Sequence, residues 1–457
     1  MKAFVTGGTG FLGLHLIRTL IAKNVEVSCL IQSDLPSRKP AVYRNLIEWN
    51  VNLRHGDITN CDKLCEALDD NYEYVFHLAG IVALRDKKIY ERINVNGTRN
   101  LLEAVQRTHI DIQRLVHMSS IAAMGAIKSD EPLSEEVAPK PVTPYEVSKY
   151  KGEQLVREFH EVSGIPATVV RAPMIYGYGE HSGMLKLAKV IAKGIIPVST
   201  DKTSIPLVYV KNLADGLILC AEKSQKPFDI YIISDARTYT LTEIAENIAE
   251  KLKIKPLRLK LPMALLKVAA NKFEYLRYVV SNVRLSIDKA VKELEYKPKD
   301  FCKQGLKETV QYYILKGLLK CGNYPLSPFD ALRIGLKEEE GLGTAYEYYA
   351  KTKILTRYLR RAHKVEKTLI ISLPRMHGSV ADVVATLKEL GISFTTMEIS
   401  DEVEVEGLEE NFDVIMVIGD FLKNLGKLVS TLKRRSNTVI LFLSLIHISE
   451  PTRQAEI

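Results

Sequence analysis

Apolar runs of strand length alternate with helix-like segments through the first half of the chain. The runs are AFVT, VEVSCLI, VNLRHGD, YVFHLAG, RLVHMSS and ATVVRAP, and helix-like segments lie between them at 11–23, 61–69, 87–106 and 145–163. Strands that alternate with helices in this way form βαβ units and a parallel sheet. The sequence therefore predicts an α/β fold with a Rossmann-type, doubly wound sheet, in which ligands bind at the carboxyl ends of the strands.

A glycine-rich turn, TGGTGFLG, joins the first apolar run to the first helix. The free backbone N–H groups of such a turn and the dipole of the helix that follows favour an anion. In this interpretation Gly7 and Gly10 leave room for a pyrophosphate, and Gly13 lets the helix pack close to the strand. An ordinary glycine-rich turn is the alternative, because the pattern alone is a weak signal.

Two further features carry chemistry. Tyr145 and Lys149 are four residues apart in a Tyr-x-x-x-Lys pattern, so they share one face of a helix. An ammonium beside a tyrosine favours the phenolate, and the pair could move a proton to or from a substrate oxygen. Ser119 and Ser120 end the run RLVHM, where a hydroxyl would face the ligand crevice. Taken singly, a surface Tyr–Lys pair and a turn serine are the competing interpretations.

In this order, the glycine turn, the serine pair and Tyr-x-x-x-Lys resemble the extended short-chain dehydrogenase/reductase family, which comprises NAD(P)-dependent epimerases, dehydratases and reductases. The resemblance covers about residues 1–320 and includes Gly56-Asp57-Ile58, HLAG at 77–80, INVNGTRNLLEA at 93–104, RAPMIYG at 171–177 and PLVYVKNLADG at 206–216. Three positions depart from the family pattern: Met124 stands in place of a tyrosine, Ala172 in place of a proline, and Lys211-Asn212 in place of an acidic pair.

The resemblance implies roles for individual residues. Tyr145 would be the acid/base, Lys149 would activate it and bond the nicotinamide ribose, and Ser120, 25 positions before the tyrosine, would orient the substrate oxygen. The implied cofactor contacts are Gly7, Gly10, Phe11, Leu12, Gly13, Gln32, Arg38, Asp57, Ile58, Leu78, Ala79, Gly80, Tyr145, Lys149 and Pro173.

The choice between NAD and NADP depends on the end of the second strand. An acid there would bond the adenosine ribose and select NAD. The strand ends Leu30-Ile31-Gln32-Ser33, and Asp34 comes slightly late. Arg38 and Lys39 are near enough in sequence to meet a 2′-phosphate, which slightly favours NADP.

The function expected first is that of an NAD(P)-dependent epimerase or dehydratase acting on a nucleotide sugar or related polyol through a transient keto intermediate. The alternative is an NADP-dependent reductase, or an oxidoreductase like 3-beta-hydroxysteroid dehydrogenase, acting on a free alcohol or ketone. A cofactor-binding regulatory or scaffold protein is a third interpretation, against which the complete serine, tyrosine and lysine set argues. A homodimer is left open.

Composition limits the partners. The net charge of +8 equals the excess in 251–284, which holds nine basic residues and one acid, so a nucleic-acid-coating surface is not indicated. That basic segment is either a weak membrane-surface contact or, as we favour, a solvated face. The six cysteines are scattered and suggest no metal site. We therefore expect a cytoplasmic protein without a signal peptide or membrane span.

The chain divides into a dinucleotide-binding domain at 1–321, a linker at 322–340 and a second, partial α/β domain at 341–444. Within the first domain, 177–205 and 229–321 are expected to form the substrate lobe. The second domain weakly resembles the first half of a class I methyltransferase, notably in FDVIMVIGD, but SLPRMHG at 372–378 replaces that family's glycine-rich loop, so methyl transfer is not assigned. Residues 445–457 resemble a translated sequencing-adapter tail and are expected to be non-native.

Overall fold

The computed structural model describes residues 1–319, apart from 70, 83–86, 128–130, 200–203, 253, 255–256, 262–281, 300–301 and 316–317; beyond 319 it describes four strands. Two compact units are present, Met1–Gly322 and Asn323–Ile457. The linker and tail predicted at 322–340 and 445–457 lie outside the described residues, as does most of the basic segment 251–284.

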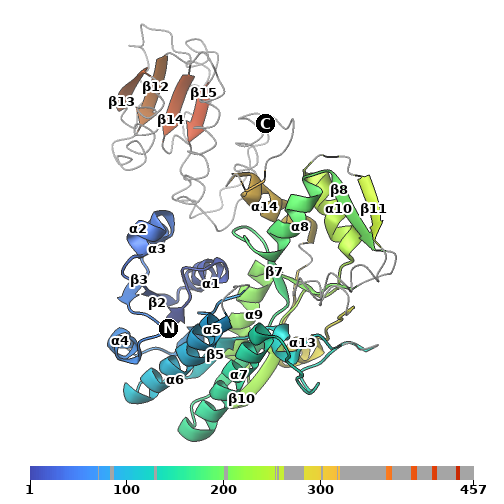
Figure 1. Cartoon of the computed structure of the whole chain (residues 1–457). Coiled ribbons are helices and arrows are strands. Elements are labelled where there is room, and N and C mark those ends of the chain that lie inside the picture. The colour runs from blue at the N-terminus through green and yellow to red at the C-terminus, as the bar shows by residue number, and fades with distance from the viewer. Residues whose placement is uncertain are drawn as a thin grey trace. The chain divides into compact units, whose positions relative to one another are not determined.

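A seven-stranded parallel sheet forms the centre of the first unit (Figure 1). Its strands are β1 (Lys2–Thr6), β2 (Glu26–Ile31), β3 (Asn52–His55), β4 (Tyr74–His77), β5 (Arg114–Met118), β6 (Ala167–Arg171) and β10 (Phe228–Ile232). Their order is β10-β6-β5-β4-β1-β2-β3, so the direction of winding reverses between β1 and β4. The predicted doubly wound α/β sheet is confirmed, and ligands of such sheets bind at this reversal.

The helices are bounded as follows: α1 Phe11–Ala22, α2 Leu35–Arg38, α3 Pro40–Glu48, α4 Cys61–Ala67, α5 Lys87–Tyr90, α6 Gly97–Arg107, α7 Pro144–Ser163, α8 Gly183–Ile191, α9 Val210–Lys223, α10 Leu241–Lys251, α13 Asp288–Leu294 and α14 Cys302–Leu315. The sequence predicts one helix over 87–106, but a π-helical segment, η1 (Glu91–Asn96), separates α5 from α6. π-Helical turns widen the backbone locally and cannot be read from an apolar period of 3.6.

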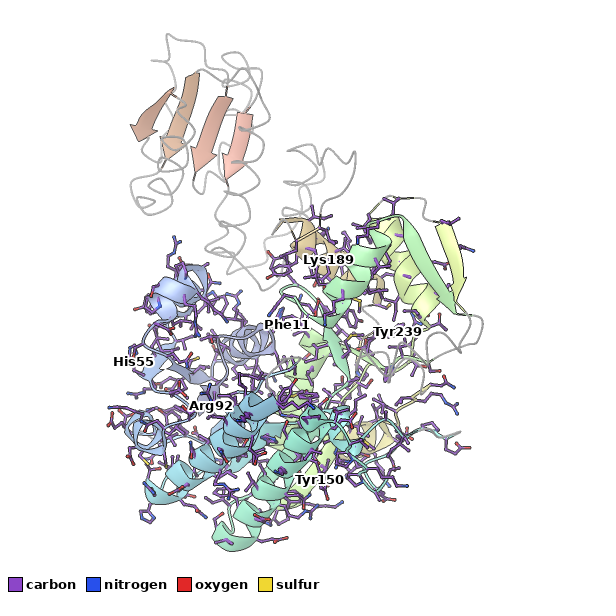
Figure 2. All side chains as sticks on the ribbon, in the orientation of Figure 1. Phe11, His55, Arg92, Tyr150, Lys189 and Tyr239 are labelled. Carbon is purple, nitrogen blue, oxygen red and sulfur yellow. The ribbon has the colours of Figure 1, made fainter. Side chains whose placement is uncertain are left out.

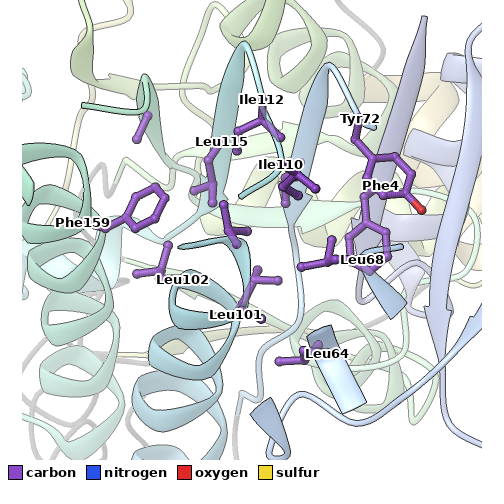
Figure 3. Close-up of a cluster of buried hydrophobic side chains, with 14 of the residues drawn as sticks. Phe4, Leu64, Leu68, Tyr72, Leu101, Leu102, Ile110, Ile112, Leu115 and Phe159 are labelled. Atoms are coloured by element: carbon purple, nitrogen blue, oxygen red, sulfur yellow. The ribbon is translucent and has the colours of Figure 1, made fainter. Parts of the chain in front are cut away.

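Alternation along the strands builds the core. One face of the sheet contributes Phe4, Val75, Leu115 and Val169, which pack with buried side chains of α4, α6 and α7 (Figure 3). The ring of Phe4 lies 5.2 Å from that of Tyr72, centroid to centroid. On the other side, α1 and α9 pack against each other. Because helices cover both faces, the sheet is accessible at the carboxyl ends of its strands, which we call the open edge.

Later segments of the first unit pack together in a second group, the region that the sequence predicts as the substrate lobe. Two short parallel strands, β8 (Ile195–Ser199) and β11 (Leu257–Leu261), pair with each other. Helix α10 contacts β8, α8 and α14 (Figure 1). A second short pair, β7 (Met174–Tyr176) with β9 (Leu207–Tyr209), connects this lobe to the sheet.

The second unit contains a parallel four-stranded sheet in the order β13-β12-β14-β15. Its strands are β12 (Lys367–Ser372), β13 (Ser393–Glu398), β14 (Val414–Ile418) and β15 (Val439–Phe442). The helices predicted between them lie outside the described residues, and the methyltransferase resemblance stays a prediction.

Candidate active site

Glycine is required for different structural reasons at the different positions of the TGGTGFLG turn. Gly7 has φ +73°, and a Cβ there would lie 2.6 Å from the Ala79 backbone nitrogen. At Gly13 a Cβ would lie 2.3 Å from the Gly7 carbonyl oxygen, so the helix can pack this closely on the turn only without a side chain. Gly10, the N-cap of α1, has an ordinary φ of −88°, and a Cβ would meet only the Gly7 oxygen, at 3.2 Å. Backbone and packing thus require glycine at 7 and 13, whereas Gly10 borders open space at the helix N-terminus.

The structure gives Gly7 a reason besides the space for a pyrophosphate that the sequence predicts for both Gly7 and Gly10. Gly7 is needed by the turn that follows β4, where Leu78 N donates to Thr6 O over 3.1 Å and Ala79 N to Thr6 Oγ1 over 3.3 Å. Gly8, which the sequence interpretation passed over, packs inward, and a Cβ there would lie 2.4 Å from Cys29 Sγ. The turns after β1 and β4 therefore form one rigid edge at the reversal of the sheet.

The predicted adenosine-side residues come together at the end of β2. Arg38 Nη2 donates to Gln32 Oε1 over 2.7 Å, and Gln32 Nε2 donates to Asp57 Oδ2 over 2.5 Å. Burial alone would raise the pKa of Asp57, but hydrogen bonds from Thr59 and Gln32 outweigh it and lower that pKa. Ile58 is buried and packs beside Gly97 at the start of α6.

Two cations lie side by side at this place. Lys39 Nζ donates to the Thr9 carbonyl in the glycine turn over 3.1 Å, while Arg38 also faces Asp34 at 3.6 Å. Burial and the neighbouring charge of Arg38 lower the pKa of Lys39. Two neighbouring cations beside the glycine turn are a favourable site for a doubly charged anion.

Phe11 and Leu12 begin α1, and the Phe11 ring (Figure 2) packs edge-on against His15 at 5.6 Å and beside Gly179. His15 Nε2 donates to the Tyr178 carbonyl over 2.8 Å. The side chain of Phe11 therefore contacts the loop after β7, and a cofactor contact from Phe11 or Leu12 would use the backbone. Pro173 is buried just before β7.

Helix α7 carries the Tyr-x-x-x-Lys pair and is fixed at both ends. Thr143 Oγ1 accepts from Glu146 N, while the Glu146 side chain accepts from the Thr143 backbone, which forms a capping box. The helix ends at Gly164, in the left-handed conformation with φ +72°. The Tyr145 ring is half-buried and lies 5.7 Å from that of Tyr90.

Lys149, the second residue of the Tyr-x-x-x-Lys pattern, is buried. Its Nζ donates to the Met118 carbonyl at the end of β5 over 2.7 Å, and the same Nζ lies 3.9 Å from the position that a Cβ on Gly80 would take. Burial lowers the pKa of Lys149 to about 8, although Glu153 opposes the shift. Lys149 therefore connects the turn at Gly80 with the strand end that carries the serines.

The two serines have different surroundings. Ser119 is buried, and its Oγ donates to Glu153 Oε1 over 2.5 Å. Ser120 is half-buried and extended; its Oγ accepts from Ala122 N over 3.2 Å and lies 3.4 Å from the Ala172 carbonyl, to which it donates. Ser119 is thus committed to the protein interior, whereas Ser120 is the more exposed of the two, and its role in catalysis stays a prediction.

Asn94 lies in the π-helical segment and was not singled out from the sequence, although its motif INVNGT was. Its side chain accepts from Ile81 N over 2.8 Å and donates to Ile81 O over 3.1 Å and to Ser148 Oγ over 3.0 Å. The same amide therefore joins the turn after β4 to α7. An asparagine in a helix pattern gives no sign of such long-range contacts.

Two buried histidines line the sheet below Lys149. His77 is held between Thr6 Oγ1 at 2.7 Å and Thr98 Oγ1 at 2.9 Å, and its ring lies 5.1 Å from that of His117. Burial, reinforced by the charge of Lys149, lowers the pKa of His77 to about 3 and that of His117 well below its ordinary value. Both rings are therefore neutral near pH 7.

The departures at 124, 172 and 211–212 lie mostly in the interior. Met124 is fully buried with Leu133, Ile232 and Val283, and Ala172 is buried too. Asn212 Nδ2 donates to Asp235 Oδ1 over 2.8 Å, within a network that also receives the Tyr176 hydroxyl at 2.8 Å. Met124 lies in the turn after β5, Ala172 in the loop after β6, and Lys211-Asn212 in α9.

None of the described helices is both long and apolar enough to cross a bilayer. Among the residues that the structure describes, no group of three or more His, Cys, Asp and Glu side chains could hold a metal ion.

Comparisons with known proteins agree with this architecture. The chain is 29% identical over 357 residues to a Mycobacterium tuberculosis 3 beta-hydroxysteroid dehydrogenase/Delta 5-->4-isomerase, covering 68% of this chain and 90% of that one. It is 27% identical over 334 residues to a Stigmatella aurantiaca 4-hydroxy-2-methyl-3-oxo-4-farnesyl-3,4-dihydroquinoline-1-oxide ketoreductase, covering 67% and 95%. The structure of a Thermotoga maritima UDP-glucose 4-epimerase with UDP-glucose matches with a TM-score of 0.58 and 23% identity, over 69% of this chain and 99% of that one, which supports the fold.

A family model supplies the assignment. The model of the NAD dependent epimerase/dehydratase family matches residues 3–234. This range runs from β1 to the end of β10 and includes the glycine turn, Ser120, Tyr145 and Lys149. The family resemblance inferred from the sequence motifs is confirmed for this part of the chain. The chain belongs to the NAD-dependent epimerase/dehydratase family and is an NAD(P)-dependent enzyme.

Proposed function

We propose that the chain is an NADP-dependent oxidoreductase acting on a secondary alcohol or ketone. The observation that carries this proposal is the pair Arg38 and Lys39, held against Gln32 and the Thr9 carbonyl beside the glycine turn. A 2′-phosphate would place a dianion between these cations. An enzyme that exchanges its cofactor at each turnover suits this chemistry, because a net reduction must release the oxidised form.

The residues of the site fit the cofactor. Gly10 leaves space at the N-terminus of α1 for the pyrophosphate, and Lys149, which in the family bonds the nicotinamide ribose, lies beside Gly80. When bound, the nicotinamide supplies or accepts the hydride. Tyr145 gives a proton to the carbonyl oxygen as the hydride arrives at carbon, or takes it in the reverse direction. Ser120 holds that oxygen by a hydrogen bond.

A nucleotide-sugar epimerase or dehydratase, the function that the sequence favours, is the second candidate. It is supported by the family that matches residues 3–234. The first proposal is supported by the two curated relatives named above, a hydroxysteroid dehydrogenase and a ketoreductase, which align over about two thirds of the chain. The same Tyr145, Lys149 and Ser120 serve both reactions, so cofactor exchange is the discriminating property.

The proposal is tested first by cofactor binding. Replacing both cations, Arg38→Gln with Lys39→Gln, should weaken NADPH roughly 10- to 100-fold, because hydrogen bonds to charged groups contribute about 1.5–3 kcal/mol. NADH affinity, measured by the same fluorescence titration, should change little and is the internal control. Equal losses for both cofactors would show that the cations do not read the 2′-phosphate.

Turnover is the second test. A 3β-hydroxysteroid with NADP⁺ and a set of ketones with NADPH should change absorbance at 340 nm, whereas UDP-glucose should give no net change. In Tyr145→Phe the rate should fall about 10²- to 10⁴-fold with NADPH affinity kept, because only the proton-transfer group is lost. Tyr150→Phe, the same change one residue beyond Lys149, is the matched control. Release of stoichiometric NAD from the denatured protein, with interconversion of UDP-sugars, would favour the second candidate.

A further inference from the structure

A buried carboxylate lies one helical turn beyond Lys149. Glu153 is on the same helix, four residues later, and its side chain is 1% exposed. A buried charge is costly unless it is paired and hydrogen-bonded. The proposed proton transfer at Tyr145 makes no direct use of Glu153, so its position beside the site needs a reason.

The Glu153 carboxylate accepts three hydrogen bonds, from residues at the ends of two strands. Arg171 at the end of β6 donates to it twice, from Nη2 to Oε2 over 2.8 Å and from Nε to Oε1 over 3.1 Å. Ser119 at the end of β5 adds a third hydrogen bond, to Oε1. The residues next to these two partners, Ala172 and Ser120, are joined by the hydrogen bond from Ser120 Oγ to Ala172 O. The carboxylate therefore fixes the strand ends that orient Ser120.

The same carboxylate acts on the charge of Lys149. The titratable groups around Lys149 are Tyr145 and Glu153 on α7, His77 on β4, His117 on β5 and, behind Glu153, Arg171 on β6. The two histidines are neutral, and burial of Lys149 favours the uncharged amine. Glu153 opposes that effect.

We propose that Glu153 is a positioning residue of the active site, which places a negative charge one helical turn from Lys149 and holds Ser120 in place through Ser119 and Arg171. The inference rests on the proposed roles of Lys149 and Ser120, but the state of Lys149 can be measured without substrate or cofactor. A purely structural ion pair would stabilise the fold without setting that state.

The test is the titration of Lys149 in the full chain labelled with ε-¹³C lysine, with its resonance assigned by its loss in Lys149→Met. In Glu153→Gln the midpoint should fall by about one pH unit or more, because an opposite charge one helical turn away has been removed. In Glu153→Asp, which keeps the charge, the midpoint should stay near the wild-type value. In Arg171→Gln the midpoint should rise, because the carboxylate loses its compensating cation.

Asp229→Asn is the matched control. Asp229 is also a buried carboxylate in an ion pair, with Lys289. It lies on β10, an edge strand of the sheet. The substitution should lower the melting temperature and leave the Lys149 midpoint unchanged. If Glu153→Gln and Arg171→Gln both lower the melting temperature and neither moves the midpoint, the proposal is overturned. Should one of the two variants fail to fold, the opposite shift expected in the other still decides. Failure of ketone reduction would refute the proposed function without touching this result.

Discussion

At the scale of single residues, identical residue types at the carboxyl ends of the strands have different structural roles. Gly13 and Gly7 are required by contacts under 3 Å to backbone atoms, whereas Gly10 meets only one atom at 3.2 Å. Ser119 and Ser120 are neighbours, yet one bonds a buried carboxylate and the other lies near the open edge. Residue type alone predicts which chemistry is available, and the contacts decide which residue supplies it.

The glycines give a prediction at this scale. Gly13→Ala should destabilise the fold by about 1–3 kcal/mol or more, because its Cβ overlaps the Gly7 oxygen and the backbone must move. Gly10→Val should lower the free energy of unfolding by at most about 0.5–2 kcal/mol, because valine is a poor N-cap residue. It should abolish dinucleotide binding, because its side chain occupies the space at the helix N-terminus. Urea unfolding and calorimetry with NADPH measure the two effects. Undiminished affinity in Gly10→Val would reject the pyrophosphate site.

At the scale of elements, the loop after β7 is held from two sides. From α1, His15 bonds the Tyr178 carbonyl; from α14, Thr309 Oγ1 accepts from Gly177 N over 2.9 Å. Gly177 and Gly179 have φ +140° and +103°, values that favour glycine. The sequence motif RAPMIYG places this loop in the site, but its partners lie more than 130 residues away along the chain and leave no local signal.

Removing one of these supports should have a measurable cost. Thr309→Val keeps the shape of a fully buried side chain and leaves the Gly177 N–H without its acceptor, which should lower the free energy of unfolding by about 1–3 kcal/mol. Thr309→Ser keeps the hydroxyl and is the matched control for the loss of the methyl group. NADPH affinity should change little in either variant, because the glycine turn is untouched. Equal stability of the valine and serine variants would contradict the role of this hydrogen bond.

At the scale of the whole molecule, the alternation of apolar strands and helices in the sequence is sufficient to predict the α/β fold class, because such elements can bury their apolar faces in few ways. Motif spacing predicts a site made of Ser120, Tyr145 and Lys149, near the carboxyl ends of the strands. The polar contacts beneath that edge were not predictable: Glu153, Asn94 and Arg171 look like ordinary surface or strand residues in the sequence. Their burial is set by which strands become neighbours, and the order of strands has no local sequence signal.

The buried histidines give the whole molecule a pH dependence. Burial lowers the pKa of His15 to about 4 and that of His77 to about 3, whereas each titrates near 6.5 when unfolded. Below pH 6.5 the unfolded chain binds protons that the folded chain does not. Stability should therefore fall as the pH falls from 6.5 toward 4, by about 1.4 kcal/mol per pH unit for each such histidine.

The sign can be isolated with one variant, because buried acids act in the opposite direction. Burial raises the pKa values of Glu180 and Asp235, so these groups take up protons first in the folded chain and stabilise the fold as the pH falls.

His15→Gln removes one histidine and keeps a donor for the Tyr178 carbonyl. The stability of the wild type relative to this variant should be constant above pH 7 and should decrease by about 1.4 kcal/mol per pH unit between 6.5 and 4. Urea unfolding at half-unit steps of pH measures this difference, and a difference that stays constant down to pH 4.5 would mean that His15 is not held neutral in the folded chain.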